Sequence, residues 1–253
     1  MKIGLIQFNP VWEDKESNKE KISELLNSKE IDVDLLIFPE MTLTGFTMRS
    51  ETYAEEIEGE SFAYFASITE KFECDVIAGI IEHSSGKYFN TLMHIEKSGR
   101  LKNHYRKIHP FSFSNEDKHF SAGDKPIVTE INRWQTGLSI CYDLRFPELY
   151  RQYGRDRVHL IINIANWPDT RIEHWSTLLK ARAIENQCYV VGVNRVGDAQ
   201  GLHYNGFTSI YDPMGKTIAS VEYEERIIFA EIDKTIVDET RKKFPFLDDI
   251  RLV

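Results

Sequence analysis

Apolar residues gather along the chain in short runs that are separated by polar segments. The runs with the length of strands are 2–8, 34–38, 75–81, 88–96, 135–140, 158–165, 189–194, 207–211 and 227–232. Several of them are continuous stretches of Val, Ile and Leu, which is typical of strands buried on both faces of a sheet. The pattern therefore predicts a core rich in β-structure.

Between these runs, apolar residues recur at helical spacing. The segments 18–28, 61–72 and 171–187 each carry an apolar stripe along one face, as amphipathic helices do. We expect Thr170 to cap the last of them, because Glu173 follows at the spacing of a capping box. Strands that alternate with amphipathic helices predict a layered α/β fold with helices outside a sheet core.

Composition narrows the class of protein. The chain has 253 residues and a net charge of −9, with 42% hydrophobic and 28% charged residues. These proportions are ordinary for a globular protein, and the acidic balance disfavours nucleic acid as a partner. No apolar run approaches the length of a membrane helix, and the N-terminus leads directly into a strand-like segment. We therefore expect neither a membrane partner nor a signal peptide.

The chain shows no repeat, linker or low-complexity segment. We expect a single domain over residues 1–253, with a C-terminal tail at about 235–253. The three cysteines, Cys74, Cys141 and Cys188, are widely spaced and form no CxxC pair. This usage predicts no disulfide framework and favours a reducing, cytoplasmic compartment.

Three reactive side chains each follow an apolar run. Glu40 comes after 34–38, Lys107 after the run that ends at Tyr105, and Cys141 after 135–140. Each residue alone has an ordinary interpretation, because most free cysteines are small buried hydrophobes and most Glu and Lys are exposed. However, the carboxyl ends of strands in an α/β sheet are where sites are usually built. We therefore expect these three residues to meet.

The segments around these residues carry a family resemblance. Residues 38–40 (Phe-Pro-Glu), 105–109 (Tyr-Arg-Lys-Ile-His) and 140–147 (Ile-Cys-Tyr-Asp-Leu-Arg-Phe-Pro) resemble, in order and spacing, the nitrilase superfamily of carbon–nitrogen hydrolases. The resemblance implies a four-layer α-β-β-α sandwich, in which helices flank two mixed sheets, and a homodimer formed through the outer helices. It also implies a small-molecule amide substrate and neither a metal nor an organic cofactor.

The resemblance implies a role for each of these residues. Cys141 would be the nucleophile, and Glu40 would take its proton, return it to the departing ammonia and later activate water. Lys107 and the backbone N–H of Tyr142 would face the developing oxyanion. Amide hydrolysis requires these functions, because an amide is a poor electrophile with a poor leaving group.

Further residues complete the expected site. The family carries a second glutamate at the position of Glu116, which would hold Lys107, with Asp117 as the rival if the loop register slips. Residues 165–168 (Ala-Asn-Trp-Pro) and 194–197 (Asn-Arg-Val-Gly) resemble the omega-amidase branch, which hydrolyses 2-oxo-dicarboxylic acid monoamides such as 2-oxoglutaramate and 2-oxosuccinamate. We therefore place Asn166 and Trp167 in the substrate pocket.

Other interpretations stay open at this point. The chain could be a deaminated-glutathione amidase, a general aliphatic amidase or an N-carbamoyl amino acid hydrolase, or a non-catalytic binding module on the same fold. His104, His109 and His119 lack the spacing of a metal-binding helix, so we expect no metal site. The candidates for binding a substrate carboxylate are Arg145, Arg171 and Arg195, although Arg145 could instead form an ion pair with Asp143 or Glu148.

Overall fold

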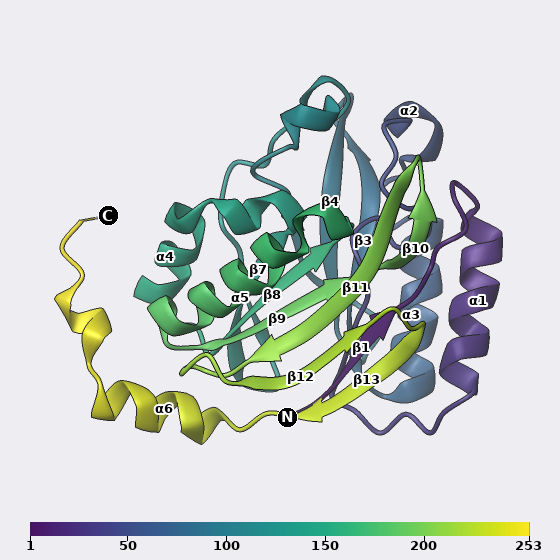
Figure 1. Ribbon diagram of the computed structural model, residues 1–253. Helices are drawn as coiled ribbons and strands as arrows, with labels where there is room; N and C mark the ends of the chain where they lie inside the picture. The colour runs from purple at the N-terminus through teal and green to yellow at the C-terminus, as the bar shows by residue number, and fades with distance from the viewer. Residues whose placement is uncertain (253) are drawn as a thin grey trace.

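Two β-sheets lie face to face between two layers of helices in the computed structural model, which describes residues 1–252 (Figure 1). The four-layer α-β-β-α sandwich predicted above is confirmed. Both sheets are mixed, since each contains parallel and antiparallel neighbours.

The first sheet has the strand order β13-β1-β2-β3-β4-β5. Its strands are β1 (Lys2–Gln7), β2 (Leu35–Ile37), β3 (Asp75–Ser84), β4 (Lys87–Ile95), β5 (Leu101–Arg106) and β13 (Arg226–Glu231). The neighbours β1, β2 and β3 are parallel, whereas β4 is antiparallel to both β3 and β5. The strands β2, β3 and β5 therefore end at the same edge. Helices α1 (Lys15–Asn27) and α3 (Glu60–Phe72) cover the outer face (Figure 1).

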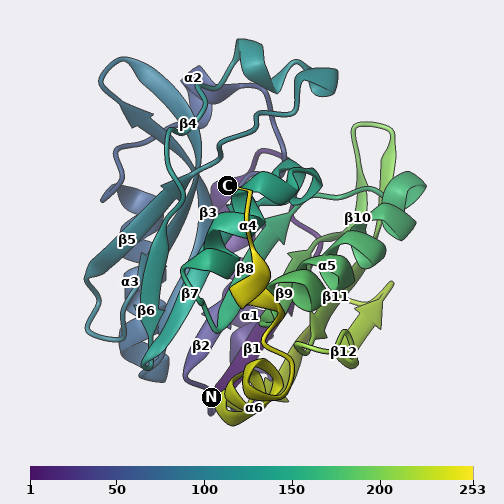
Figure 2. The ribbon, with the colours of Figure 1, turned by 90° about the vertical axis from the view of Figure 1, so that its left-hand side faces the viewer.

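The second sheet has the order β10-β11-β9-β8-β7-β6, and β12 pairs with β11. Its strands are β6 (Val128–Ile131), β7 (Trp134–Ile140), β8 (Leu160–Ala165), β9 (Tyr189–Asn194), β10 (Val196–Ala199), β11 (Leu202–Tyr211) and β12 (Thr217–Glu222). The central strands β7, β8 and β9 are parallel. Helices α4 (Pro147–Arg155) and α5 (Ile172–Asn186) form the outer layer on this side (Figure 2).

The alternation of side chains along β1 shows how the sheets pack. Ile3 and Leu5 belong to the larger apolar cluster, which includes residues of both sheets and of α4 and α5. Ile6 and Phe8 belong to the second cluster, with residues of α1 and α3. Gln7 is a buried polar exception, and its Oε1 accepts a hydrogen bond from the backbone N–H of Thr208 in β11 at 3.1 Å. The two sheets are thus joined by a polar contact as well as by apolar packing.

The sequence pattern missed several short elements. These are the strands β6, β10 and β12, the short helix α2 (Ser50–Tyr53) and the helix α6 (Lys234–Lys243). The prediction that Thr170 caps α5 was wrong, because the helix begins at Ile172 after a 3-10 turn over Asp169–Arg171 and has no side-chain cap. The indole N–H of Trp167 donates to the backbone carbonyl of Arg171 at 2.8 Å, which ties this turn to the end of β8.

The C-terminal tail docks on its own chain. Val237 in α6 is fully buried. The guanidinium of Arg241 donates to the backbone carbonyls of Arg157, Val158 and Asn186 at 3.0, 2.6 and 3.3 Å. The chain then passes through a 3-10 turn at Phe246–Asp249 (Figure 2). Residue 253, the last of the predicted domain and tail, lies outside the described residues.

None of the helices in residues 1–252 is both long enough and apolar enough to span a membrane.

Candidate active site

The polar residues that follow four strands meet at one edge of the sandwich. Glu40 lies three residues after β2, and Lys107 directly follows β5, both in the first sheet. Cys141 directly follows β7, and Asn166 directly follows β8, both in the second sheet. Neither sheet could therefore supply the whole site alone.

Three of the predicted site residues form a buried charged cluster. The Lys107 ammonium lies 2.9 Å from Glu40 Oε1 and 2.9 Å from Glu116 Oε2. All three side chains are at most 1% exposed, so water does not screen their charges. Asp117, the rival of Glu116, is exposed. The structure therefore places Glu116, and not its neighbour, against Lys107.

Two asparagines fix the position of Glu40. The side-chain amide of Asn90, in β4, donates to Glu40 Oε1 at 2.7 Å and to Glu116 Oε1 at 2.9 Å. The backbone N–H of Asn166 donates to Glu40 Oε2 at 2.8 Å. Each carboxylate oxygen of Glu40 thus accepts at least one hydrogen bond. These contacts fix the rotamer of the side chain.

A glycine lets the backbone of Glu40 reach this position. The chain passes over β3 after it leaves β2, and Gly79 lies below the crossing. A Cβ atom on Gly79 would come within 2.6 Å of the Met41 nitrogen and 2.9 Å of the Glu40 Cα. Such approaches do not occur in real proteins, so only glycine fits here.

The turn that carries Cys141 is sharp and firmly held. Cys141 has a positive φ of 48° and begins a 3-10 turn over Cys141–Arg145. Its backbone N–H donates to Asn163 Oδ1 at 3.0 Å. The carboxylate of Asp143 accepts hydrogen bonds from the backbone N–H groups of Ile140 and His109, both at 3.0 Å. These bonds hold the sparsely populated backbone conformation of Cys141.

Asp143 also links this turn to the segment of Lys107. Its Oδ2 accepts from the hydroxyl of Tyr105, in β5, at 2.8 Å, and its Oδ1 contacts His109 Nδ1 at 2.8 Å. The His109 ring stacks on Phe146 with 3.8 Å between centroids. The ends of β5 and β7 are therefore tied together through one buried carboxylate.

The buried charges set the protonation of the site. Burial raises the pKa of the Cys141 thiol well above its usual range, and the Glu40 carboxylate raises it further, while the Lys107 ammonium opposes both. Burial alone would lower the pKa of Lys107, but the charges of Glu116 and Glu40 outweigh burial and raise it. Burial and the Glu40 charge thus favour the neutral thiol, and a thiol needs a base before it can attack.

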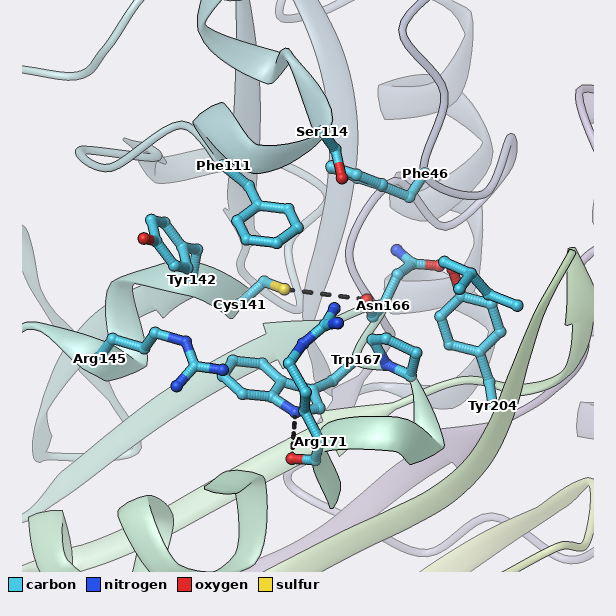
Figure 3. A pocket seen from close by; sticks show the side chains of 12 residues that line it. Phe46, Phe111, Ser114, Cys141, Tyr142, Arg145, Asn166, Trp167, Arg171 and Tyr204 are labelled. Carbon is cyan, nitrogen blue, oxygen red and sulfur yellow. Dashed lines mark hydrogen bonds between the residues drawn. The ribbon is translucent and has the colours of Figure 1, made fainter. Parts of the chain in front are cut away.

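A cavity opens directly above Cys141 (Figure 3). Its walls are largely aromatic, and Cys141 and Asn166 form part of its floor. The Sγ atom of Cys141 lies 4.0 Å from the backbone carbonyl oxygen of Asn166. The aromatic residues that line it are Phe46, Phe111, Tyr142, Trp167 and Tyr204. The cavity is therefore suited to a small molecule with an apolar body.

The sequence indicated the reactive side chains but not the residues that hold them in position. Asn166 and Trp167 line the cavity, and Tyr142 follows Cys141 in the turn. Their roles toward a substrate stay predictions. Asn90 lies in a segment that gave no chemical signal in the sequence beyond a polar side chain next to apolar neighbours. Asp143 lies within the motif at 140–147, where the sequence suggested a partner for Arg145 and not a support of the turn. Within residues 1–252 no group of three or more His, Cys, Asp or Glu side chains is arranged to hold a metal ion.

The chain is similar in sequence and fold to known proteins. Residues 2–242 match the family model described as carbon-nitrogen hydrolase. A protein of Bacillus subtilis named 2-oxoglutaramate amidase is 31% identical, over 98% of this chain and 97% of the relative. The omega-amidase YafV of Escherichia coli K12 is 34% identical, over 98% of this chain and 96% of the relative.

A solved structure extends the comparison to the fold. XC1258 from Xanthomonas campestris is described as a CN-hydrolase superfamily protein with an arsenic adduct in its active site. It superimposes with a TM-score of 0.93 and 31% identity, over 100% of this chain and 98% of the other.

Proposed function

The chain belongs to the carbon–nitrogen hydrolase family, and on that premise we propose that it removes the terminal amide of a 2-oxo-dicarboxylic acid monoamide. The enzyme class is that of the family, which hydrolyses carbon–nitrogen bonds other than peptide bonds. The substrate is our proposal. It is supported by the similarity to relatives that are named 2-oxoglutaramate amidase and omega-amidase.

The first half of the reaction forms a thioester. Cys141 Sγ attacks the amide carbon while its proton passes to Glu40, and the carbonyl oxygen becomes an oxyanion. Lys107 Nζ and the backbone N–H of Tyr142 stabilise that charge. The tetrahedral intermediate then collapses, the carbon–nitrogen bond breaks, and Glu40 returns the proton to the leaving ammonia.

The second half hydrolyses the thioester. A water molecule gives its proton to Glu40 and attacks the same carbon, so that the oxyanion forms again. When this intermediate collapses, the carbon–sulfur bond breaks and the proton returns to the Cys141 sulfur. The free carboxylic acid leaves, and the site regains its first protonation state.

The observation that carries this proposal is the buried cluster beside Cys141. Glu40 accepts a hydrogen bond from Lys107 at 2.9 Å, and Glu116 holds the same ammonium from another side. A thiol whose pKa is raised by burial requires a nearby base, and Glu40 is the buried carboxylate that these contacts direct to that role.

Ammonia release tests the proposal. The purified protein should release ammonia from 2-oxoglutaramate and 2-oxosuccinamate faster than from glutamine or butyramide, and Cys141→Ala should abolish the release. If only another amide is hydrolysed, or if carbon dioxide appears together with ammonia from an N-carbamoyl amino acid, the proposed substrate is wrong. If Cys141→Ala remains active, the proposed nucleophile is wrong.

Two wider expectations accompany this proposal. The family resemblance predicts a homodimer formed through the outer helices. The three cysteines are free in the structure, which is compatible with the reducing, cytoplasmic compartment expected from the sequence. Both stay predictions.

A further inference from the structure

Two arginines lie at the mouth of the cavity above Cys141. Arg145 ends the 3-10 turn that begins at Cys141, and Arg171 ends the turn that precedes α5. Both side chains line the cavity. In Figure 3 the guanidinium of Arg171 reaches in front of Cys141 and Asn166, and that of Arg145 lies beside the Trp167 ring. We call these two residues the arginine pair.

Within residues 1–252, the arginine pair has no carboxylate partner within ion-pair distance. Arg145 Nη1 contacts His174 Nδ1 at 3.2 Å, and the ion pair with Asp143 or Glu148 that the sequence left open as an alternative does not form. No hydrogen bond from the Arg171 guanidinium to the described part of the chain is seen. Two other arginines differ, because the half-buried Arg106 and the buried Arg182 are paired with glutamates.

Aromatic rings hold the arginine pair in place. The Arg145 guanidinium carbon lies 4.7 Å from the centroid of the Trp167 ring, and that of Arg171 lies 5.6 Å from the centroid of Phe111. Trp167 is itself fixed, since its backbone N–H donates to Asn194 Oδ1 at 2.7 Å. A guanidinium stacked on a ring keeps its N–H donors free at the edge of its plane, where they can bind a planar anion.

The pair is electrostatically unfavourable when the cavity is empty. Burial lowers the pKa of Arg145, and the charge of Arg171 lowers it further. Two cations beside largely apolar walls, without a counter-charge from the protein, are stabilised when an anion enters between them. Arginine forks bind carboxylates in particular, because two parallel N–H donors match the two oxygens.

We propose that the arginine pair is a carboxylate-binding site that selects amides bearing a carboxylate and directs their amide carbon toward Cys141. This inference rests on the proposed function and specifies how its substrate class is recognised. The third candidate from the sequence, Arg195, has no part in it. That residue is fully buried, its Nη2 donates to Asn9 Oδ1 at 2.8 Å, and it stacks under Tyr204.

Paired substrates test the inference. Glutaramate carries one amide and one carboxylate, whereas its diamide, glutaramide, is neutral and nearly the same shape. In Arg145→Met or Arg171→Met, the ratio of kcat/KM for glutaramate to that for glutaramide should fall about 100-fold, mainly through KM, because charge-assisted hydrogen bonds are lost. The double variant should lose less than the product of the single losses, since both arginines hold one carboxylate.

The controls separate charge from structure. Arg100→Met removes an exposed arginine that bonds Glu96 in the turn before β5. This turn lies at the end of β5 away from Lys107, so the variant should leave the ratio of kcat/KM for the two substrates unchanged. Arg171→Lys keeps the charge and should retain part of the preference for glutaramate over glutaramide. This variant replaces Arg171→Met in the test if the methionine variant fails to fold. An equal loss on both substrates, or an unchanged ratio, would overturn the inference.

A binding measurement keeps this test independent of the proposed substrate. Glutarate should bind Cys141→Ala in calorimetry, and adding Arg171→Met should weaken its Kd about 100-fold. If the protein hydrolyses neither 2-oxo monoamide but still binds glutarate through these arginines, the proposed substrate fails while the carboxylate site stands. If glutarate does not bind, or binds the Arg171→Met form equally well, the carboxylate site fails.

Discussion

Asn90 lies between two buried carboxylates and donates a hydrogen bond to each. Its amide is neutral, so it satisfies oxygens of Glu40 and Glu116 without adding a further charge to the cluster. Lys107 supplies the one cation that both carboxylates share. The geometry of Glu40 therefore depends on a residue that takes no part in the reaction itself.

Replacing Asn90 with leucine should remove both donors while keeping the volume of the side chain similar. We expect kcat to fall about 10- to 100-fold and the free energy of unfolding to fall by roughly 2–3 kcal/mol, because buried carboxylate oxygens lose charge-assisted bonds. Steady-state kinetics and urea titration measure the two effects. Asn103→Leu is the control, since the Asn103 amide in β5 donates to Thr129 in β6 of the other sheet and touches neither carboxylate. A wild-type kcat in Asn90→Leu would show that Glu40 does not need this support.

The residues of the site differ in how well the sequence predicts them. Glu40, Lys107 and Cys141 could be predicted, because each places a reactive group directly after an apolar run. The supporting role of Asn90 could not, because a lone amide beside a strand is chemically ordinary, and the motif that contains Asp143 does not show which groups its carboxylate binds. Their importance arises only when segments far apart in the chain meet, as when Asp143 bonds Tyr105.

At the scale of elements, the crossing of the Glu40 segment over β3 controls the site. The backbone N–H of Thr42 donates to the Gly79 carbonyl at 2.9 Å, and the Gly79 N–H donates to Thr42 Oγ1 at 3.2 Å. The Glu40 segment is thus hydrogen-bonded to β3 at Gly79, which has no side chain to keep the two backbones apart.

Gly79→Ala should push the Glu40 segment away from β3. The new Cβ would contact backbone atoms of Met41 and Glu40, which cannot move aside as a flexible side chain does. We expect at least a 100-fold loss of kcat/KM, since small misplacements of a catalytic group are costly, and a loss of roughly 1–3 kcal/mol in stability. Gly86→Ala is the control for activity: nothing lies within 4 Å of its Cβ position, so no neighbour is displaced, although its φ of 73° means that alanine there also costs some stability. Near-normal turnover by Gly79→Ala would show that the close crossing over β3 does not determine the position of Glu40.

Elements also differ in how well the sequence predicts them. The central strands are continuous apolar runs, so their positions could be found directly. The edge strand β12 alternates exposed and half-buried residues, and a pattern of that kind does not differ from an ordinary polar loop. The start of α5 was misplaced because a 3-10 turn over Asp169–Arg171 precedes the helix, and the capping-box pattern at Thr170 and Glu173 does not distinguish such a turn from the first turn of an α-helix.

At the scale of the whole molecule, two thiols far from the site couple stability to pH. Burial raises the pKa of both Cys74 and Cys188 to about 12. In the unfolded chain these thiols titrate near pH 8.5. Their contribution to stability is therefore complete below that pH and is lost as the pH rises from about 8.5 toward 12.

Between pH 9 and 11, each of these thiols should lower the free energy of unfolding by up to about 1.4 kcal/mol per pH unit. Urea titrations over this range should give a shallower decline for Cys188→Ala, and a shallower one still when Cys74→Ala is added. Ile162→Val is the control, because it removes a buried methylene without removing a titrating group and should lower stability equally at every pH. If the free energy of unfolding declined with pH equally steeply in wild type and in Cys188→Ala, the raised pKa of Cys188 would be refuted.

The pairing of the first strand with the last one has a consequence for how the protein is made. Lys2 in β1 is the register partner of Glu231 in β13. While the ribosome synthesises the chain, β1 can pair with β2 early, but its other edge stays open until nearly all residues have emerged. An open strand edge invites pairing with other chains. The interval before β13 arrives is therefore when a nascent chain is most exposed to aggregation, and slow translation of the last third would prolong it.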